Sequence, residues 1–441
     1  MAKLTFSGGI HPAGKKSATK NKPLNTIPAP ELLYFPLSQH IGAPLKPIVN
    51  IGDRVLKTQK IADTDAYMSA PLHSSVSGKV KDIGLYLNHT NSKVPTIVIE
   101  NDGLEEMAEP LHTKNIDDLS PNEMRKIIRD AGIVGMGGAG FPTHVKLSPP
   151  EDKEITHLII NAAECEPYLT SDRRVMLEMT DDVVGGMKCL MRLLNLSKCY
   201  VGIEDNAPEA ISILEAKTEN TGIEIVVLKK KYPQGSEKQI INAITGKEVP
   251  MGKLPMDVGC IVINIGTVAE IYRALAHGLP LHRRIVTVSG DAVKNPSNIY
   301  VPLGTPFSTL VDACGGTILE PHKIIMGGPM MGIAGVSLDI PVVKGTSGLL
   351  LFGEKYTKKE QELNCIRCGR CVSVCPMKLV PTTLDMYSRK GDTETLIKNN
   401  IMNCMECGSC TYVCPSKRFL VQSIRLGKQK VNAKRAKEAK K

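Results

Sequence analysis

The sequence contains no tryptophan, and aromatic residues make up only 4% of it. Proteins that bind single-stranded nucleic acid stack bases on aromatic side chains, so this scarcity argues against nucleic acid as a partner. Long apolar runs are also missing, and no stretch approaches the roughly 20 residues of a membrane-spanning helix. We therefore expect a chain that reaches any membrane only through partner subunits or surface charge.

A secretory leader is not visible either, because residues 1–26 are polar, rich in Lys and Pro, and lack a central apolar run. The 13 cysteines do not suggest a disulfide framework, since eight of them stand at spacings typical of metal ligands. Thiols kept reduced at such spacings point to the cytoplasm. Much of the net charge of +10 lies in residues 428–441, a basic segment with seven Lys or Arg and one Glu.

Composition shifts along the 441 residues predict several domains of α/β and α+β character. Residues 1–112 show short β segments punctuated by Gly and Pro, a pattern typical of a small barrel or sandwich. This stretch resembles the biotinyl/lipoyl barrel-sandwich module. A carrier of that family presents a Lys at a hairpin tip, whereas residues 63–68 contain none, so a structural module is favoured over a carrier.

The middle of the chain alternates helix and strand patterns, which is typical of a parallel α/β domain. Over residues 113–282 the patterns predict helices at 120–131, 175–196, 207–219 and 267–276, and strands at 155–161, 199–203, 223–228 and 260–265. Residues 283–353 return to strands and turns, and we expect a small β-grasp-like domain there. Residues 354–427 carry cysteine runs between helical patches, and residues 428–441 form a basic tail that is helical or disordered.

Two cysteine runs near the C-terminus share the spacing C-x2-C-x2-C-x3-C-P, which is the signature of two-cluster ferredoxins. The runs are Cys365, Cys368, Cys371 and Cys375, then Cys404, Cys407, Cys410 and Cys414. Because the fourth Cys of each run ligates the other cluster, we predict one [4Fe–4S] cluster on Cys365, Cys368, Cys371 and Cys414, and a second on Cys404, Cys407, Cys410 and Cys375. Structural zinc is the alternative, but two such runs exceed the four ligands that a zinc site needs.

A glycine-rich loop at residues 135–140 satisfies G-x-G-x-x-G, but its context is not that of a dinucleotide-binding fingerprint. A helix precedes it where a strand should, and Phe141 and Pro142 follow it where a helix should. The glycines still indicate backbone that approaches a phosphate or ring, with a flexible linker as the alternative. Polar loops at residues 161–168, 229–238 and 264–267 follow predicted parallel strands, where α/β sheets bind their ligands.

Several of these segments carry a family resemblance. Residues 135–146 resemble the flavin loop of the NADH-oxidising subunit of respiratory complex I, and residues 161–167, 232–237 and 264–267 match further parts of that site in the same order. With residues 6–12 and the twin cysteine runs, the chain is identified as a member of the RnfC family, one of the subunit types of Rnf complexes. These complexes are membrane-bound ferredoxin:NAD oxidoreductases that pump Na+ or H+.

The resemblance implies two [4Fe–4S] clusters, non-covalent FMN, NAD(H) as substrate, and a soluble-ligand-binding type for the β-grasp-like domain. It places Gly135, Gly137, Gly138 and Gly140 against FMN, Lys146 at its phosphate, Asn161, Asn264 and Thr267 at its ring or ribityl chain, and Tyr232 and Gly235 along the flavin. Phe141, Glu166 and Glu237 are expected to contact NADH, and Glu164 joins the cofactor-binding set. The sequence departs from the complex I loop at Met136, where that loop has Arg, and at Ala163, where it has an acid.

The expected function is electron transfer between NAD(H), FMN and two clusters, with the cofactors supplying the chemistry and no general acid or base among the residues. The resemblance also implies partners, namely integral membrane and iron–sulfur subunits of the same complex and, indirectly, ferredoxin. It implies a peripheral position on the cytoplasmic face of the membrane. A flavin-dependent cobalamin reductase and a non-catalytic iron–sulfur wiring subunit are the alternatives.

Overall fold

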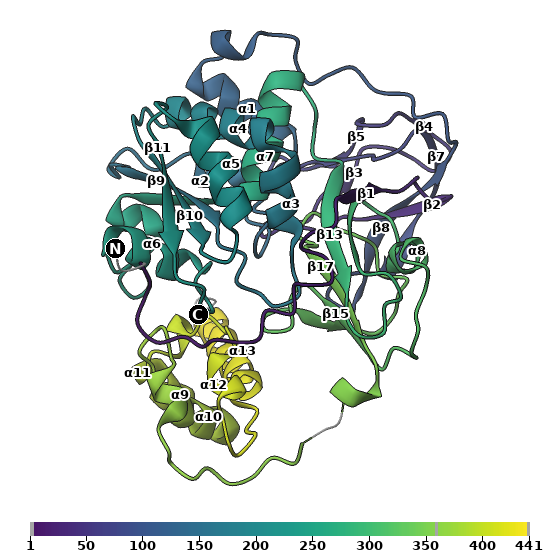
Figure 1. Ribbon diagram of the computed structural model, residues 1–441. Helices are drawn as coiled ribbons and strands as arrows, with labels where there is room; N and C mark the ends of the chain where they lie inside the picture. Colours follow the sequence, from purple (N-terminus) through teal and green to yellow (C-terminus); the bar gives the residue numbers. More distant parts are fainter. Residues whose placement is uncertain (1–3, 358–359, 439–441) are drawn as a thin grey trace.

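The N-terminal module consists of two antiparallel sheets, ordered β2-β8-β7-β4 and β3-β5-β6 (Figure 1). The computed structural model describes residues 4–357 and 360–438. Leu33 and Phe35 are fully buried and Tyr34 between them is not, as the two-residue period of a strand requires. The strands are β2 (Leu32–Pro36), β3 (Lys46–Pro47), β4 (Arg54–Val55), β5 (Lys60–Asp63), β6 (Leu72–His73), β7 (Gly78–Leu87) and β8 (Lys93–Asn101).

The α/β domain is built on a parallel sheet in the order β11-β10-β9-β12. Its strands are β9 (His157–Ala162), β10 (Cys199–Glu204), β11 (Ile223–Leu228) and β12 (Cys260–Asn264), and its helices are α1 (Pro121–Asp130), α2 (Thr143–Lys146), α3 (Ser171–Glu178), α4 (Thr180–Leu193), α5 (Pro208–Thr218), α6 (Glu237–Thr245) and α7 (Ile265–His277). Leu158 and Ile160 pack into the core that includes α4 and α7, whereas Ile159 packs against α6. The parallel sheet expected from the alternating pattern is therefore confirmed, with helices on both faces.

One predicted helix of this domain differs from the observed structure. The sequence pattern predicts a single helix over residues 175–196, but α3 ends at Glu178 and α4 begins at Thr180. Met179 between them has φ −124° and ψ 32°, outside the helical range. The apolar period continues across the break without Pro or Gly, and the local signal for a new helix is the pair of acids, Asp181 and Asp182, in the first turn of α4.

The third domain is a mixed sheet in the order β1-β14-β13-β17-β15-β16. Its elements are β13 (Arg283–Ser289), β14 (Ser297–Pro302), α8 (Phe307–Ala313), β15 (Lys323–Met326), β16 (Ile333–Gly335) and β17 (Gly348–Phe352). The edge strand β1 (Leu24–Thr26) comes from the N-terminal segment and pairs in parallel with β14. The N-terminal segment therefore contributes to a sheet far along the chain and not only to the first module.

The C-terminal domain is helical, with α9 (Arg370–Ser373), α10 (Pro381–Lys390), α11 (Thr393–Lys398), α12 (Ser409–Tyr412) and α13 (Leu420–Glu438). The basic segment from residue 428 is helical as far as Glu438, one of the two expected states, but it is not a separate tail, because it continues α13 and packs on this domain. Val431 is fully buried in the domain core, and Lys428 Nζ donates to the carbonyl oxygen of Cys404 at 3.0 Å. Residues 439–441 of the expected tail lie outside the described residues.

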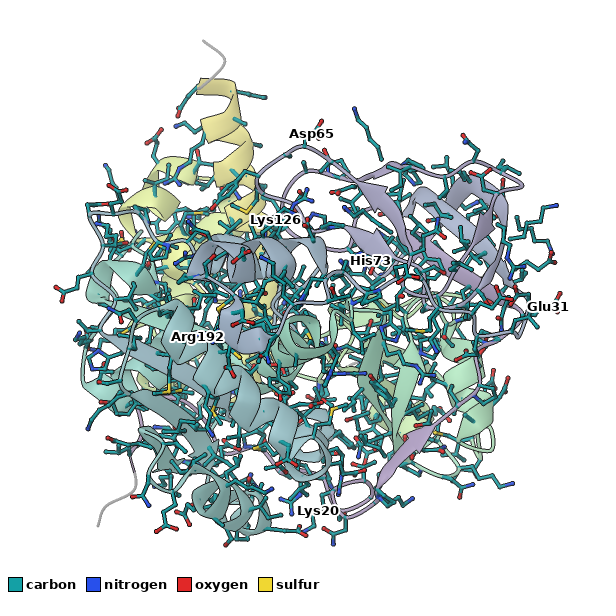
Figure 2. The ribbon with its side chains drawn as sticks, turned by 90° about the horizontal axis from the view of Figure 1, so that it is seen from above. Lys20, Glu31, Asp65, His73, Lys126 and Arg192 are labelled. Carbon is teal, nitrogen blue, oxygen red and sulfur yellow. The ribbon has the colours of Figure 1, made fainter. Side chains whose placement is uncertain are left out.

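Two sets of contacts fix these domains relative to one another. The N-terminal segment passes between the α/β domain and the helical domain (Figure 1), where Ile10 N donates to Tyr232 O at 2.8 Å and Gly9 N donates to Val374 O at 2.9 Å. Arg129 of α1 forms an ion pair with Asp63 of β5 at 2.8 Å. Figure 2 shows this second boundary, with the loop that carries Asp65 beside α1.

Candidate functional site

The parallel sheet places two asparagines at adjacent strand ends. Asn161 of β9 and Asn264 of β12 are partners in the β9–β12 register. In the order β11-β10-β9-β12, the chain adds strands on one side of β9 first and then returns to add β12 on its other side, so the strand order changes direction between β9 and β12. Ligands of open α/β sheets bind beyond the carboxyl ends of strands at such a switch point. The pair therefore marks the expected ligand crevice.

The glycine-rich loop covers this switch point. Gly135 N donates to Phe141 O at 2.8 Å, which closes the loop at its base. A Cβ on Gly137 would lie 2.8 Å from Nδ2 of Asn264, so only glycine permits this approach. Met136 N donates to Oγ1 of Thr267 at 3.0 Å, so the loop also contacts the first turn of α7.

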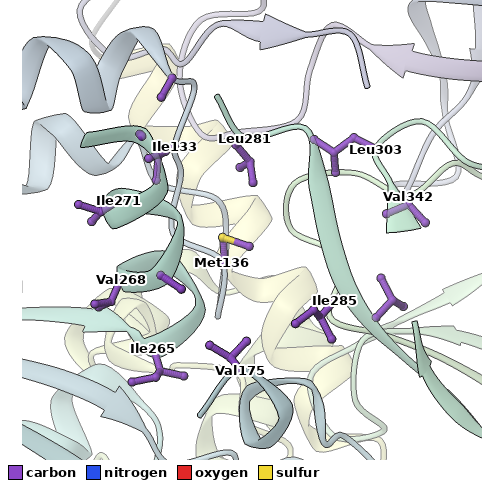
Figure 3. Close-up of a cluster of buried hydrophobic side chains, with 14 of the residues drawn as sticks. Ile133, Met136, Val175, Ile265, Val268, Ile271, Leu281, Ile285, Leu303 and Val342 are labelled. Atoms are coloured by element: carbon purple, nitrogen blue, oxygen red, sulfur yellow. The ribbon is translucent and has the colours of Figure 1, made fainter. Parts of the chain in front are cut away.

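Met136 faces away from the crevice. Its side chain is 6% exposed and points into the apolar cluster that contains Val175, Ile265 and Ile285 (Figure 3). A cationic side chain at this position would be buried among these residues, which is costly without a partner. Met136, where the sequence departs from the complex I loop, is therefore a core residue of this fold.

Gly140, the last glycine of the loop, has φ +69° and a backbone conformation that L side chains rarely adopt. A Cβ there would lie 3.2 Å from the carbonyl oxygen of Gln39. Ile41 N donates to the carbonyl oxygen of Gly140 at 3.1 Å. The loop is thus held from the N-terminal module as well as from α7.

The loop after β11 reaches the same crevice. Asn161 Nδ2 donates to Gly235 O at 2.6 Å, and a Cβ on Gly235 would lie 2.2 Å from the carbonyl oxygen of Ala163. Tyr232 of this loop is 1% exposed, and its hydroxyl donates to Cys407 O at 2.8 Å. This bond directs the hydroxyl of Tyr232 to the helical domain, and the expected position of Tyr232 along the flavin stays a prediction.

Charged residues flank the crevice in two pairs. Lys146 Nζ donates to Glu237 Oε1 at 2.6 Å and to Val262 O at 3.0 Å, so two residues with different expected ligands are brought together. In the second pair, Glu164 Oε1 accepts from Asp172 N at 2.9 Å, and its second oxygen lies 3.6 Å from Lys16 Nζ. The structure therefore groups Lys146 with Glu237, and Glu164 with Lys16.

Asp172 and Lys16 were missed by the sequence reasoning. Asp172 accepts a bond from Asn264 Nδ2 at 2.8 Å, and burial together with the nearby charge of Glu164 raises the pKa of Asp172. Asp172 follows the strand-end loop by several residues, and the only local signal is its place at the start of a helix. Lys16 lies far from Glu164 in sequence, and nothing local pairs the two.

The hydrogen bonds that the structure describes for the Glu166 carboxylate go to the third domain and not to the glycine-rich loop. Its carboxylate accepts from Met330 N at 3.1 Å and from Met331 N at 2.9 Å, both in the third domain. Burial raises the pKa of Glu166 to about 7 although these two N–H groups favour the charged form. Glu166 thus anchors the turn between β15 and β16 to the α/β domain.

The eight predicted metal ligands divide between two cavities of the helical domain. One cavity is lined by Cys375, Cys404, Cys407 and Cys410. The other is lined by Cys365, Cys368, Cys371 and Cys414. Each cavity therefore takes three cysteines from one run and the fourth from the other, which is the exchange expected for a two-cluster ferredoxin fold.

The two runs also repeat in backbone conformation. Arg367 and Glu406, two residues after the first Cys of each run, have φ +56° and +61°. Gly369 and Gly408 follow with φ +75° and +77°, and the short helices α9 and α12 begin directly after them. Two thiols of each run precede the helical turn, and the third, Cys371 or Cys410, lies within it. Three thiols so close together suit three irons of one cubane, so the residues fit [4Fe–4S] clusters.

The two cavities differ in exposure and in surroundings. Cys365 and Cys368 are exposed. Cys407 is buried in a cluster with Ile10 and Tyr232. The cavity that contains Cys407 therefore faces the α/β domain, and the other faces outward.

Comparisons with known proteins agree with this domain order. Family models match as the RnfC barrel sandwich hybrid domain at residues 4–104, the Nuo51 FMN-binding domain at 128–273, the SLBB domain at 285–334 and the 4Fe-4S dicluster domain at 364–417. The C-subunit of the proton-translocating ferredoxin:NAD(+) oxidoreductase complex of Clostridium ljungdahlii is 51% identical over 423 residues, which are 96% of this chain and 93% of that protein. The chain belongs to this RnfC family.

Other members of the RnfC family align over nearly the whole chain. The C-subunit of the Na(+)-translocating complex of Acetobacterium woodii is 46% identical over 98% of both chains, and the C-subunit of the ion-translocating complex of Rhodobacter capsulatus is 41% identical over 99% of this chain and 85% of that protein. A crystal structure of NAD+-reducing [NiFe]-hydrogenase in the H2-reduced state shares the fold alone, with TM-score 0.51 and 19% identity over 71% of this chain and 63% of that chain.

The cofactors of this RnfC protein follow from the matched domains. They are FMN, through the FMN-binding domain, and two [4Fe–4S] clusters, through the dicluster domain. The glycine-rich loop fits FMN, because Gly137 lets the loop backbone approach Asn264 at the switch point, and Gly138 leaves open space for a ligand against the backbone. The cysteine cavities fit the clusters, because each supplies the four thiols that a cubane needs.

Proposed function

We propose that this chain passes electrons between NAD(H), FMN and two [4Fe–4S] clusters as a subunit of an ion-translocating ferredoxin:NAD oxidoreductase. The observation that carries the proposal is one continuous set of contacts. Asn161 at the switch point bonds Gly235, and Tyr232 in the same loop bonds the carbonyl oxygen of Cys407. The expected flavin crevice and one cysteine cavity thus share a single loop.

In this proposal the chain's own residues position FMN. Gly135, Gly137, Gly138 and Gly140 admit the ligand close to the backbone, and Lys146 binds its phosphate in exchange for the ion pair with Glu237. Asn161, Asn264 and Thr267 orient the ring or the ribityl chain by hydrogen bonds. When bound, FMN supplies the exchange between two-electron transfer with NAD(H) and one-electron transfer with the clusters.

The same crevice is the proposed entry for NAD(H). Phe141 and Glu237 are the proposed contacts, which is supported by the bond of Phe141 O to the glycine-rich loop and by the bond of Glu237 to Lys146. Glu164 completes the proposed cofactor-binding set, and it is held by Asp172 N and Lys16. A direct contact of Glu166 with NAD(H) requires that its carboxylate leave the two N–H groups of residues 330 and 331.

We name the cavity of Cys375, Cys404, Cys407 and Cys410 the proximal cluster site, and the cavity of Cys365, Cys368, Cys371 and Cys414 the distal cluster site. The proximal site adjoins the flavin-binding domain through Tyr232, and the distal site carries the exposed cysteines. The proposed route therefore runs from FMN to the proximal cluster, then to the distal cluster, and out to an iron–sulfur partner subunit.

Membrane attachment is proposed to come from integral partner subunits on the cytoplasmic side, with ferredoxin as an indirect partner. Among the described residues, none of the helices has the length and apolar character to cross a bilayer. The basic second half of α13 adds charge that anionic lipid attracts by about 1 kcal/mol per residue near the surface. That contribution is screened by salt, so docking to partners is expected to dominate.

Anaerobic addition of NADH to the isolated, reconstituted chain tests the proposal. The visible absorbance of bound FMN should bleach, and the two clusters should then become reduced. A non-catalytic wiring subunit would retain its clusters and fail to bleach the flavin. Unbleached flavin in a preparation with full FMN and iron content would contradict the proposal.

A further inference from the structure

Arg284 is a buried cation behind the glycine-rich loop. It belongs to β13 of the third domain and lies outside the residue ranges that match the FMN-binding and SLBB families. Its Nη2 donates to Met136 O at 2.5 Å and its Nε donates to Thr346 O at 2.6 Å. Only 4% of the side chain is exposed. The guanidinium therefore reaches across a domain boundary to hold the loop from its protein side.

The charge of Arg284 is not neutralised by a direct partner. Among the described residues, no carboxylate forms an ion pair with it, and its Nη1 is buried without a hydrogen-bond partner. The carboxylates of Asp172 and Glu270 act on its charge only through space. Burial lowers the pKa of Arg284 only to about 10, so the group stays charged at neutral pH. A buried, unpaired cation is costly and needs a compensating interaction.

The position of this charge points to what compensates it. Met136 stands between Gly135 and Gly137, and Gly137 lies against Asn264 at the switch point. Arg284 and the crevice assigned to FMN therefore contact neighbouring residues of the same loop. Hydride transfer from NADH turns neutral oxidised isoalloxazine into its anionic reduced form, with NAD+ as the other product. A fixed positive charge beside the ring favours that anionic form.

We propose that Arg284 is a positioning residue that holds the glycine-rich loop and raises the reduction potential of the bound FMN. The inference rests on the proposed function only in the assignment of FMN to this loop. Arg284 acts through the backbone of Met136 and through its field, and it transfers neither electrons nor protons. A loss of its charge should weaken the binding of reduced FMN more than the binding of oxidised FMN.

The test is the midpoint potential of bound FMN, measured by spectroelectrochemical titration of the holoprotein, together with the Kd of oxidised FMN. Arg284→Gln should raise the Kd ratio of reduced to oxidised FMN at least tenfold, which lowers the potential of a two-electron couple by about 30 mV. Arg284→Lys keeps the charge but cannot bond both carbonyl groups. It should bind both states more weakly and leave their ratio within about threefold of the wild type.

Arg283→Gln is the matched control, because Arg283 is the neighbour on the same strand and its guanidinium lies over the ring of Tyr300. It should leave the flavin potential unchanged. An unchanged potential in Arg284→Gln, or an equal decrease in Arg283→Gln, would overturn the inference. If Arg284→Gln does not fold, a potential lowered by about 30 mV or more in Arg284→Lys overturns it, and a wild-type ratio supports it. A wild-type chain that binds no FMN would instead contradict the proposed function.

Discussion

Gly138 offers a substitution that separates FMN binding from folding. An added Cβ at Gly138 meets no described atom within 4 Å, and its φ lies outside the left-handed range that favours glycine. Gly→Ala at such a position stabilises a protein by about 0.4–1 kcal/mol, because the unfolded chain loses conformational freedom. The melting temperature of Gly138→Ala should therefore equal or slightly exceed that of the wild type.

The FMN affinity of the same variant should fall. If the backbone of Gly138 contacts the flavin, the new methyl group occupies ligand space, and such overpacking costs about 1–3 kcal/mol. At about 1.4 kcal/mol per factor of ten, the Kd of FMN should rise by roughly 5- to 150-fold. Fluorescence titration of the flavin-free protein with FMN measures this Kd, and thermal denaturation of the same samples measures the fold.

Gly137→Ala is the variant with which the stability and FMN affinity of Gly138→Ala are compared. Its Cβ would lie 2.8 Å from Nδ2 of Asn264, so this variant should lose both stability and FMN affinity. Gly138→Ala should lose affinity alone. Wild-type FMN affinity in Gly138→Ala would refute the assignment of the loop to the flavin, because the loop would then have another role.

The remaining predictions concern the clusters, one buried acid and the last helix. Cys371→Ser should damage the distal cluster and Cys375→Ser the proximal one, each leaving the other cluster visible by EPR spectroscopy. Burial raises the pKa of Glu166 from 4.5 to about 7, so between pH 4.5 and pH 7 the folded state binds a proton that the unfolded state has lost. The free energy of unfolding therefore falls as the pH rises through this range. The melting temperature of Glu166→Gln should accordingly decrease less from pH 5 to pH 7 than that of the wild type, and an equal decrease would contradict this. Truncation after Gly427 removes the buried Val431 and should lower iron retention, whereas full iron content would show that the second half of α13 is dispensable.

Local sequence was sufficient where residue spacing determines the chemistry. The cysteine runs predict which four thiols share each cavity, because a tight loop and the helix after it fix the direction of every ligand. The same holds for Ser120 and Glu123, which form a capping box at the start of α1 as their spacing predicts. The strand over residues 223–228 coincides with β11.

Contacts between distant segments were beyond the sequence. Leu24 pairs with Asn298 of β14, and Arg284 bonds Met136, although neither pair is close in the chain. The polarity of residues 428–438 suggested a tail, but this segment continues the helix whose earlier turns bury Leu420 and Ile424, and Val431 extends that buried face. Glu166 carries no local sign that its partners are the backbone N–H groups of Met330 and Met331, since tertiary packing alone brings them together.

The route of the electrons is tested most directly by freeze-quench EPR spectroscopy of the isolated chain after mixing with NADH. Cys368→Ser removes a ligand of the distal cluster, and the proximal cluster should still be reduced at the wild-type rate. Cys407→Ser removes a ligand of the proximal cluster, and the distal cluster should stay oxidised over the same time. Reduction of the distal cluster in Cys407→Ser as fast as in the wild type would contradict the proposed order.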